Sequence, residues 1–567
     1  MSVLIECVPN FSEGRDTQVL QSIRECVEAV DGVRLLDVDP GAATHRTVFT
    51  FVGSPAAVME AAFRSIECAQ TQIDMRTHTG EHPRMGATDV CPLVPVQGCT
   101  LEDCVRYSVE LAERVAAELN IPVYLYESSA TAPHRKRLPD LRKGEYEALE
   151  SKLDDPKWGP DFGPREWTES VARSGATVIG ARPFLIAWNI NLSTSNQRKA
   201  DKIAAQLREK GIYARDENGE LKRDDSGKPY RLPGRFKSVN AIGWIIEEYG
   251  CAQISVNLLD YNTTPIYAVY DEARRLAIEE GVVVTGSELV GLIPQEALLQ
   301  AGLHYIKKSG GSTAKPHAEI LKVAIRSLGL DDLKEFDPEA CVIEQKISTD
   351  GPLVKLSTRA FSDLLASDAP APGGGSTAAL CGSLSVGLTA MVAQLSTKIT
   401  KKSWPYGQPR PLGWEEFDTA GARAQELREK FLNYIDLDTA AFDALMSAGR
   451  LPKRNEAEKK IRFNAMREAI RMAIETPMSA LESSIEAMQL AEVAMRGNPN
   501  ARSDAGVAVA TARACAEGAW MNVRINLSSM RDIKRKTAYA EKADALLENA
   551  RSLSDKLIAE VESFLRA

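Results

Sequence analysis

A chain of 567 residues exceeds the roughly 250 to 300 residues at which a single hydrophobic core stops growing, so two or three domains are expected. Hydrophobic residues at 44% and charged residues at 26% are typical of globular protein and exclude a largely disordered chain. The net charge of -9 disfavours binding to nucleic acid, because phosphate binding depends on basic surfaces. We expect no apolar run near the roughly 18 residues of a membrane helix, and hence no membrane.

The start of the chain, MSVLIECVPNFSEG, lacks a basic segment, a long apolar stretch and a small-residue cleavage site, which favours a cytoplasmic location. The ten cysteines form no CxxC pair. This indicates reduced, mostly buried thiols rather than a disulfide framework or a zinc site.

Strand-like runs alternate with helical patterns from LIECVPNF and DTQVLQSIRECVEAV through VRLLDVD and HRTVFTFVG to PVYLYES. A polar stretch at 131–174 interrupts this alternation, and a similar set begins at FLIAWNINLS. The likeness of the two sets is a weak sign of internal duplication. We predict two similar α/β sandwich subdomains, residues 1–184 and 185–347.

Within the second subdomain, the charged segment DENGELKRDDSGK at 216–228 predicts a solvated hairpin or loop, and CVIEQKI is strand-like. A linker is expected at 348–355, followed by an all-helical bundle domain at 356–567. Its helices are predicted at 357–366, 377–398, 415–448, 455–475, 477–497, 501–530 and from 538 onward.

All six histidines lie in the predicted α/β part. Acid–base chemistry in the helical part is therefore expected to depend on a carboxylate, a lysine or another group.

The densest polar cluster of the α/β part is HTGEHPRMGATDVCP, with His78, Glu81, His82 and Arg84 in a loop before an apolar strand. Histidine titrates near neutrality and so can move a proton in either direction. Structural hydrogen bonding and metal binding are alternatives, although a helical HxxxH metal site is disfavoured by the glycine and proline of this loop.

A second cluster, LDVDPGAATHRTVF, places polar side chains between two strands, where a simple turn is the alternative interpretation. Asp39 is the predicted carboxylate partner in catalysis. Arg46 is predicted to hold a substrate carboxylate.

In the helical part, APAPGGGS places Gly373, Gly374 and Gly375 before a helix, whose N-terminus favours anions. The segment lacks a GK[ST] ending, so a nucleotide phosphate loop is disfavoured, and a hinge or a close backbone approach is the alternative.

Polar residues of two further helices are candidates. Arg502 and Asp504 begin one helix, and Asn522 and Asn526 lie one turn apart farther along it, where ligand contact and structural bonding both remain open. In NYIDLDTAAF, Asp436 and Asp438 lie among apolar residues that could raise a carboxyl pKa, with a solvated helix face as the alternative.

The motifs ECVPNFSEG, LDVD, HTGEHPRMGATDVCP, PVYLYE, WGPDFGP and FLIAWNINL resemble the formiminotransferase domain of the formimidoyltransferase-cyclodeaminase family. APGGGS, DLDTAAF, LPK, ARSD and NVRINL look like its cyclodeaminase domain, in the family's order. The resemblance implies a folate enzyme of histidine breakdown that transfers a formimino group from formiminoglutamate to tetrahydrofolate and then closes the ring with loss of ammonia. It also implies a homo-oligomer.

By this resemblance, His82 is the catalytic histidine of the transferase and Asp438 the catalytic aspartate of the cyclodeaminase. The folate-contacting stretch would run from Gly163 to Gly175 and include Pro164, Arg165 and Ser174. The co-substrate would be tetrahydrofolate or its polyglutamylated form, with no metal.

The chain departs from the family pattern in two inserted segments, 216–228 and 401–417. The basic residues near the second could attract the glutamate tail of the folate. Rival hypotheses are a formylglutamate-specific transferase fused to a methenyltetrahydrofolate cyclohydrolase, and a folate-binding scaffold without catalysis.

Overall fold

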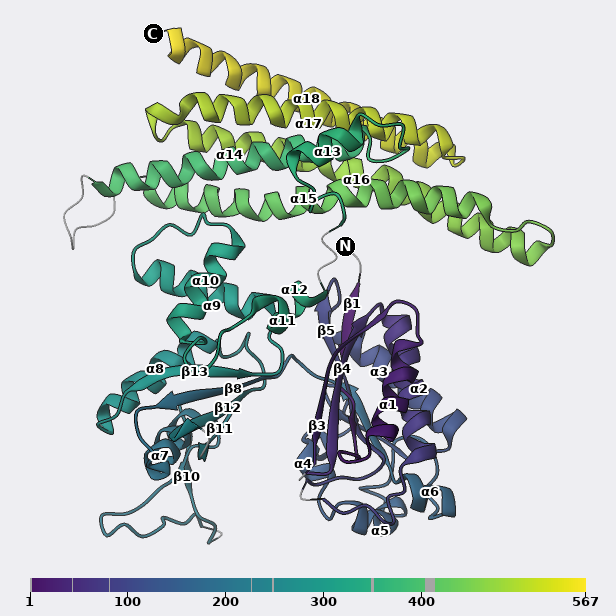
Figure 1. Ribbon diagram of the computed structural model, residues 1–567, viewed down its shortest axis with the longest axis vertical. Coiled ribbons are helices and arrows are strands. Elements are labelled where there is room, and N and C mark those ends of the chain that lie inside the picture. Colours follow the sequence, from purple (N-terminus) through teal and green to yellow (C-terminus); the bar gives the residue numbers. More distant parts are fainter. Residues whose placement is uncertain are drawn as a thin grey trace. The chain divides into compact units, whose positions relative to one another are not determined.

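The computed structural model describes residues 3–42, 44–80, 82–225, 227–246, 249–347, 351–402 and 413–566, with the backbone alone at 246 and 399–402. Internal contacts divide the chain into two compact units, Met1–Ala301 with Ile325–Ile347, and Gly302–Ala324 with Ser348–Ala567. Sheets lie in the first unit, and the longest helices lie in the second (Figure 1). The predicted change from α/β to all-helical structure is confirmed.

The first sheet joins seven strands of the described chain in the order β1-β4-β2-β5-β7-β6, with β3 paired to β4. The strands are β1 Leu4–Cys7, β2 Asn10–Phe11, β3 Val33–Gly41, β4 Arg46–Gly53, β5 Thr88–Gln97, β6 Val123–Glu127 and β7 Thr177–Ala181. Helices α1 Thr17–Glu28, α2 Pro55–Gln72 and α3 Leu101–Leu119 cover one face (Figure 1). The short helices α4 Leu138–Leu141, α5 Leu149–Leu153 and α6 Glu169–Ser174 belong to the polar stretch before β7.

The second sheet has the order β11-β12-β8-β13, all antiparallel. Its elements are β8 Ile186–Leu192, α7 Gln197–Leu207, β11 Val239–Ile246, β12 Cys251–Leu258, α8 Ile266–Glu279 and β13 Val284–Val290. The first sheet has the same spatial order: β3, β4, β1 together with β2, and β5 take the places of β11, β12, β8 and β13. Its elements also follow one another along the chain in the same succession, β-α-β-β-α-β. The shared topology shows that the two subdomains are similar, as predicted, and the first subdomain extends the common pattern with β7 and β6.

The inserted segment at 216–228 lies between β9 Ile212–Tyr213 and β10 Arg231–Leu232. Its described residues are exposed and form two successive turns, closed by backbone hydrogen bonds from Asp216 to Glu220 and from Asp224 to Lys228. The prediction of a solvated hairpin is confirmed.

Four further helices complete this stretch of the chain: α9 Gln295–Lys308, α10 His317–Leu328, α11 Pro338–Cys341 and α12 Ile343–Ile347. The strand predicted at CVIEQKI is therefore wrong. Asp337 caps the amide of Glu339 and Pro338 takes the first turn, so a helix begins just before this segment.

Residues 302–324 group with the helical unit, where Thr313 donates its backbone amide and hydroxyl to the Asp418 carboxylate at 2.6 and 2.7 Å. His304 and His317 therefore belong to the helical unit. The expectation that this part holds no histidine is corrected, because a segment remote in sequence supplies two.

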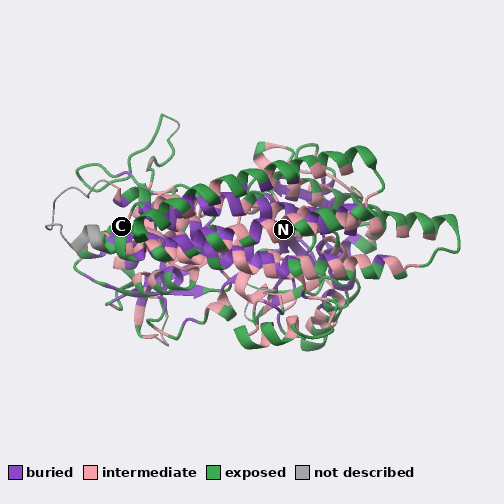
Figure 2. Cartoon of the chain, turned by 90° about the horizontal axis from the view of Figure 1, so that it is seen from above, coloured by how far each residue is buried: buried purple, intermediate pink, exposed green. Residues whose placement is uncertain are grey.

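The bundle consists of α13 Thr358–Leu365, α14 Gly374–Lys402, α15 Trp414–Arg450, α16 Glu456–Met495, α17 Arg502–Asn526 and α18 Ile533–Arg566. Small side chains form much of its core, among them Ala424, Ala491 and Ala512, which lets the helices approach closely. Figure 2 shows the long helices buried along one side and exposed along the other. Most of the inserted segment 401–417, at 403–412, lies outside the described residues.

The expectation that no apolar run approaches the length of a membrane helix is wrong for helix α14. Its residues Gly374–Lys398 are long and apolar enough to cross a membrane, with a mean hydropathy of 1.6, and 56% of that window is buried inside the protein. Contacts with α15, α16 and α17 bury it. A core helix of a soluble bundle passes the same test, so this feature is weak evidence for a membrane.

Helix α16 continues through Pro477, where the sequence predicts a break. Proline has no amide hydrogen, so the carbonyl oxygen of Ala473 loses its normal helical donor. Asn526 of α17 replaces that donor, since its Nδ2 lies 2.7 Å from this oxygen. A side chain on another helix thus supplies the missing hydrogen-bond donor. This confirms the interpretation of Asn526 as a residue of structural hydrogen bonding.

We expect Asn526→Ala to lower the free energy of unfolding by about 1–3 kcal/mol, because the carbonyl of the buried Ala473 would lose its partner. Urea unfolding of the full chain followed by helical circular dichroism measures this change. Asn433→Ala, at an exposed site on α15, is the matched control for helix propensity. Equal midpoints for the two variants would contradict the prediction.

Candidate active sites

The loop between α2 and β5, which carries His78 and His82, closes onto the turn between β3 and β4. The described residues of the loop that carries His78 and His82 are not helical, as the sequence predicts. Glu81 lies outside the described residues. A Cβ at Gly80 would lie 2.5 Å from the Thr44 carbonyl oxygen and 2.8 Å from the His45 Cβ. Only glycine allows this approach, so the loop is held against the turn.

His45 links this loop to Glu13. Its Nδ1 lies 2.9 Å from the Thr79 carbonyl oxygen and its Nε2 lies 3.0 Å from Glu13 Oε1. Both partners are acceptors, so both contacts are hydrogen bonds only when both ring nitrogens carry protons. Burial raises the pKa of Glu13, but amide donors led by Asp16, together with His45, bring it below its usual value. Glu13 therefore stays an ionised acceptor near neutrality.

His78 stacks on His45 with ring centroids 4.3 Å apart. Its Nε2 lies 2.9 Å from the His45 carbonyl oxygen, and Arg84 donates Nε to its Nδ1 at 3.3 Å. Burial lowers the pKa of His78, which favours this neutral ring. Arg84 also pairs with Glu145 and Glu147 at 3.1 and 2.7 Å. These contacts support a role in structural hydrogen bonding for His78. They also occupy the guanidinium of Arg84 with partners inside the protein.

His82 contacts Arg46. Its Nδ1 lies 2.7 Å from the Pro83 carbonyl oxygen, an acceptor, and 2.7 Å from Arg46 Nη1, a donor. With the Nδ1 proton directed to Pro83, the lone pair that faces Arg46 is on Nε2. Arg46 Nη1 reaches this Nε2, while its Nε donates to Asn10 Oδ1 at 2.9 Å. Burial lowers the pKa of His82, and the Arg46 charge lowers it further. The ring is therefore a neutral base at neutral pH, with its lone pair covered by a guanidinium.

Two arginines, Arg46 and Arg142, and the carboxylate of Asp89 act on the charge of this base. Burial lowers the pKa of Arg46 to about 10, which leaves it charged at neutral pH. Asp89 is buried, accepts the Met85 amide at 3.0 Å and forms an ion pair with Arg142. The site can therefore receive an anionic substrate next to a neutral base.

Asp39 is exposed on β3, paired in register with Val48, and no described contact joins it to His82. Its catalytic role stays a prediction without geometric support. Sequence analysis missed Glu13, Asn10 and Asp89, because nothing in local spacing links them to the loop of His82.

The predicted folate stretch has two different parts. Gly163 is exposed and lines a shallow depression with Phe162 and residues of α3, while Arg165 folds back to the Pro160 carbonyl oxygen at 3.3 Å. Ser174 is buried, and its carbonyl accepts the Ala87 amide at 2.7 Å. Gly175 packs against the backbone of residues 85 and 86. This second part supports the loop of His82, and ligand contact by Gly163, Pro164 and Arg165 stays a prediction.

In the bundle, Asp438 of α15 lies against the first turn of α14. Its Oδ2 accepts the Ser376 amide at 2.9 Å and lies 3.2 Å from the Ser376 hydroxyl, whose proton it shares with the Ile435 carbonyl oxygen at 2.8 Å. A Cβ at Gly375 would lie 2.1 Å from Asp438 Oδ1, so glycine is required there. The helix N-terminus that sequence suggests for an anion is occupied by this carboxylate. Burial raises the pKa of Asp438, although the Ser376 hydrogen bonds oppose the shift.

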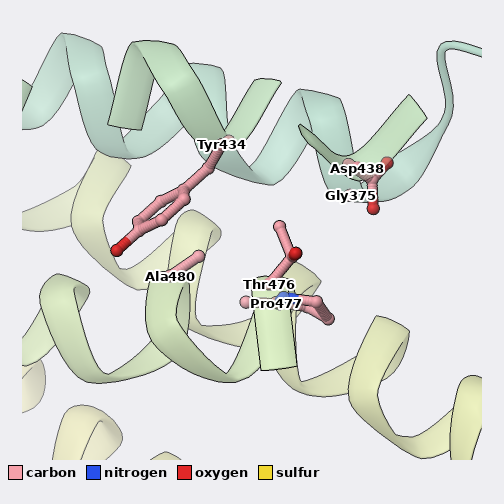
Figure 3. Close-up of a pocket in the computed structure, with 8 residues that line it drawn as sticks. Gly375, Tyr434, Asp438, Thr476, Pro477 and Ala480 are labelled. Carbon is pink, nitrogen blue, oxygen red and sulfur yellow. The ribbon is translucent and has the colours of Figure 1, made fainter. Parts of the chain in front are cut away.

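Asp438 borders a small cavity in the bundle. Figure 3 shows Tyr434, Thr476 and Pro477 around it, with Gly375 beside Asp438. The remaining lining residues are alanines of α14, α16 and α17: Ala379, Ala480 and Ala519. The cavity is therefore mostly apolar and offers a carboxylate to a small group.

Other predicted residues of the bundle lie apart from this cavity or support it. Asp436 accepts the amides of Leu353 and Val354 at 2.9 and 3.3 Å, so its role is structural. Gly374 lies beside Asn522, whereas a Cβ at Gly373 would meet nothing within 4 Å.

Arg502 and Asp504 lie at the opposite end of α17 from the cavity residue Ala519. At about 1.5 Å per residue, the seventeen positions from Arg502 to Ala519 span roughly 25 Å. Arg502 stacks on Phe564 at 4.0 Å and donates Nε to the Met495 carbonyl at 3.1 Å. Within one chain, neither residue joins Asp438. Their ligand contact stays a prediction.

Sequence analysis missed Ser376, Tyr434 and Thr476 of the bundle site. The described residues hold no group of three or more His, Cys, Asp or Glu side chains arranged for a metal ion.

We expect the Asp438 carboxyl to titrate above the ordinary 3.8, because burial disfavours its charged form. Carbon-13 NMR of protein labelled at aspartate carboxyls measures this, with Asp438→Asn to assign the signal. Ser376→Ala removes a hydrogen bond to the charged form and should raise the value further. A midpoint at or below 3.8 in the unmodified protein would refute the prediction.

Three stretches of the chain match known families. Residues 4–182 match the N-terminal subdomain of the formiminotransferase domain, and residues 187–348 match the formiminotransferase domain. Residues 357–545 match the family described as formiminotransferase-cyclodeaminase.

Individual relatives agree with these matches. The chain is 40% identical to the formimidoyltransferase-cyclodeaminase of Rattus norvegicus over 99% of both chains. It is 41% identical to the glutamate formimidoyltransferase of Thermoplasma acidophilum over 54% of this chain and 93% of that protein. It is 34% identical to the methenyltetrahydrofolate cyclohydrolase of Methylorubrum extorquens over 36% of this chain and 94% of that protein. Because the first similarity extends over almost the whole of both chains, this chain belongs to the formimidoyltransferase-cyclodeaminase family.

Proposed function

We propose that this protein is a bifunctional folate enzyme of histidine degradation. It transfers the formimino group of N-formimino-L-glutamate to N5 of tetrahydrofolate. It then converts 5-formiminotetrahydrofolate to 5,10-methenyltetrahydrofolate and ammonia. The observation that carries the proposal is the presence of two chemically different sites, around His82 and around Asp438, on a chain similar over its full length to a protein with both names.

In the transfer step, N5 of tetrahydrofolate attacks the formimino carbon and must lose a proton. The glutamate nitrogen gains a proton before it leaves. His82 accepts the first proton on Nε2 and returns it to the leaving nitrogen, so one neutral imidazole serves both events. Its lowered pKa keeps it neutral, which is the form that accepts a proton.

Arg46 controls access to this base. Its guanidinium covers Nε2 of His82 and is otherwise held by Asn10. A substrate carboxylate draws the guanidinium to itself, because an ion pair is stronger than its bond to a neutral ring. Substrate binding thereby frees the lone pair that takes the proton.

In the second step, N10 attacks the formimino carbon and closes the ring. Asp438 accepts the proton of N10 and gives it to the amino group, which leaves as ammonia. Ser376 holds one carboxylate oxygen, and no described residue donates to the other, Oδ1. The raised pKa of Asp438 suits a group that must both take and return a proton.

A cyclohydrolase is the second candidate for the helical part, favoured by its 34% identity to the Methylorubrum protein. Ring closure would then release water in place of ammonia, and formylglutamate would be the donor of the one-carbon group. The higher identity over the full chain to a cyclodeaminase fusion supports the first candidate.

The same proposal covers the co-substrate and the assembly. Tetrahydrofolate, including its polyglutamylated form, is the one-carbon acceptor, no metal takes part, and the enzyme works in the cytoplasm. A homo-oligomer is supported by large apolar side chains exposed on the bundle helices, such as Met521 and Ile525 at 56% and 66%.

The test mixes the purified full chain with tetrahydrofolate and formiminoglutamate and follows methenyltetrahydrofolate absorbance and ammonia. Both products should appear. His82→Ala should slow transfer about 10²- to 10⁴-fold and leave cyclization of supplied 5-formiminotetrahydrofolate intact. Asp438→Asn should do the reverse. If neither product appears while a parallel mixture with formylglutamate is consumed, or if each variant loses both steps, the proposal fails.

A second prediction concerns the contact of Glu13 and His45 with the loop of His82. His45→Ala removes both hydrogen bonds and should lower the turnover of formimino transfer by about tenfold or more, because a small displacement of a catalytic group is costly. Cyclization by the same preparation is the internal control, and His317→Ala, in the other compact unit, is the matched histidine control. Transfer at the normal rate in His45→Ala would show that the contact is dispensable.

A further inference from the structure

Thr476 differs from three other threonines of the bundle, whose hydroxyls form hydrogen bonds within their own helices. The hydroxyls of Thr377, Thr389 and Thr511 donate to the carbonyl four residues earlier, at 2.8 to 3.1 Å. This is the usual local bond of a threonine inside a helix. Thr476 forms no hydrogen bond with any described residue, and its side chain lines the cavity of Asp438. Its hydroxyl is therefore available to a ligand.

The neighbouring proline fixes where this hydroxyl lies. Pro477 follows directly in α16 and lines the same cavity. The carbonyl of Ala473 that the proline leaves free is bound by Asn526, so this turn of α16 is tied to α17. Thr476 is thus presented from a turn that another helix holds in place.

Thr476 faces the carboxylate across the cavity. Figure 3 shows its side chain projecting from α16 toward the helices that carry Asp438 and Gly375, whereas the hydroxyl of Tyr434 points away from Asp438. The other lining residues have no polar side-chain atom. A small polar group in this cavity would therefore find two side-chain partners, Asp438 and Thr476.

We infer that Thr476 is a second ligand-contacting residue of the cyclodeaminase site, which binds the nitrogen that leaves as ammonia. This inference rests on the proposed function and adds a residue to it. The hydroxyl oxygen accepts a hydrogen bond from the amino group of the tetrahedral intermediate. That bond orients the nitrogen lone pair toward the proton on Asp438.

The step balances when the formimino group enters as its protonated amidinium form, so that the tetrahedral intermediate carries a neutral amino group. The bond from N10 to the formimino carbon forms, and Asp438 takes the N10 proton. The same proton passes from Asp438 to the amino nitrogen, and the bond between carbon and that nitrogen breaks. The products are the methenyl cation and neutral ammonia, and Asp438 returns to its ionised form. Thr476 neither gains nor loses a proton.

Thr476→Val keeps the shape of the side chain but removes the hydroxyl, and Thr476→Ser keeps the hydroxyl. With 5-formiminotetrahydrofolate as substrate, the valine variant should lose about tenfold in kcat with little change in KM, because the bond matters after the folate is bound. The serine variant should retain most of the activity. Formimino transfer should be normal in both.

The reverse reaction gives a readout that a purely structural role would not change. With methenyltetrahydrofolate and ammonium chloride, Thr476→Val should raise the KM for ammonium several-fold and leave the KM for the folate unchanged. Thr511→Val, whose hydroxyl bonds only to its own helix, is the matched control and should match the unmodified enzyme in every assay.

The outcomes separate this inference from the proposed function. If the unmodified protein does not cyclize 5-formiminotetrahydrofolate, the proposed function fails. If it does, and Thr476→Val retains the normal kcat and ammonium KM, only the inference fails. A kcat loss that Thr476→Ser shares in full would mean that packing at this position matters and the hydroxyl does not, which also overturns the inference.

Discussion

Both sites depend on a backbone approach that only glycine allows. At Gly80, the loop of His82 lies against the turn that carries His45, and at Gly375 the first turn of α14 lies against the Asp438 carboxylate. A methyl group in either place would meet atoms at 2.1 to 2.5 Å, well inside van der Waals contact. The hydrogen bonds that hold each site, from His45 to the loop and from Ser376 to Asp438, form because these two side chains are missing.

Burial has opposite effects on the pKa values of the two groups, and each effect suits its chemistry. It lowers the pKa of His82, so the imidazole is neutral and can accept a proton. It raises the pKa of Asp438, so the carboxyl can return the proton that it takes. In each site a neighbour modifies the shift: the Arg46 charge reinforces it at His82, and Ser376 opposes it at Asp438. Proton transfer in both steps therefore follows from partial removal of water.

Helix α16 connects a local defect to the second site. Proline inside a helix frees a carbonyl, and here Asn526 binds it, so the helix continues. The same turn carries Thr476 and lines the cavity of Asp438. A residue that in sequence indicates the end of a helix thus becomes part of a cavity wall, because a neighbouring helix supplies the missing donor.

The sequence alone predicted the change from α/β to helical structure, indicated two similar subdomains, and carried the motifs whose resemblance to a known family singles out His82 and Asp438. These follow from hydrophobic periodicity and from short motifs, which are properties of neighbouring residues. Tertiary structure decided what depends on contacts between distant segments. Ser376 and Asp438 are 62 positions apart, and Glu13 and His45 are 32 apart. The same reason explains the unbroken α16, the assignment of residues 302–324 to the helical unit and the exposed position of Asp39, because no local pattern records which segments meet in the folded chain.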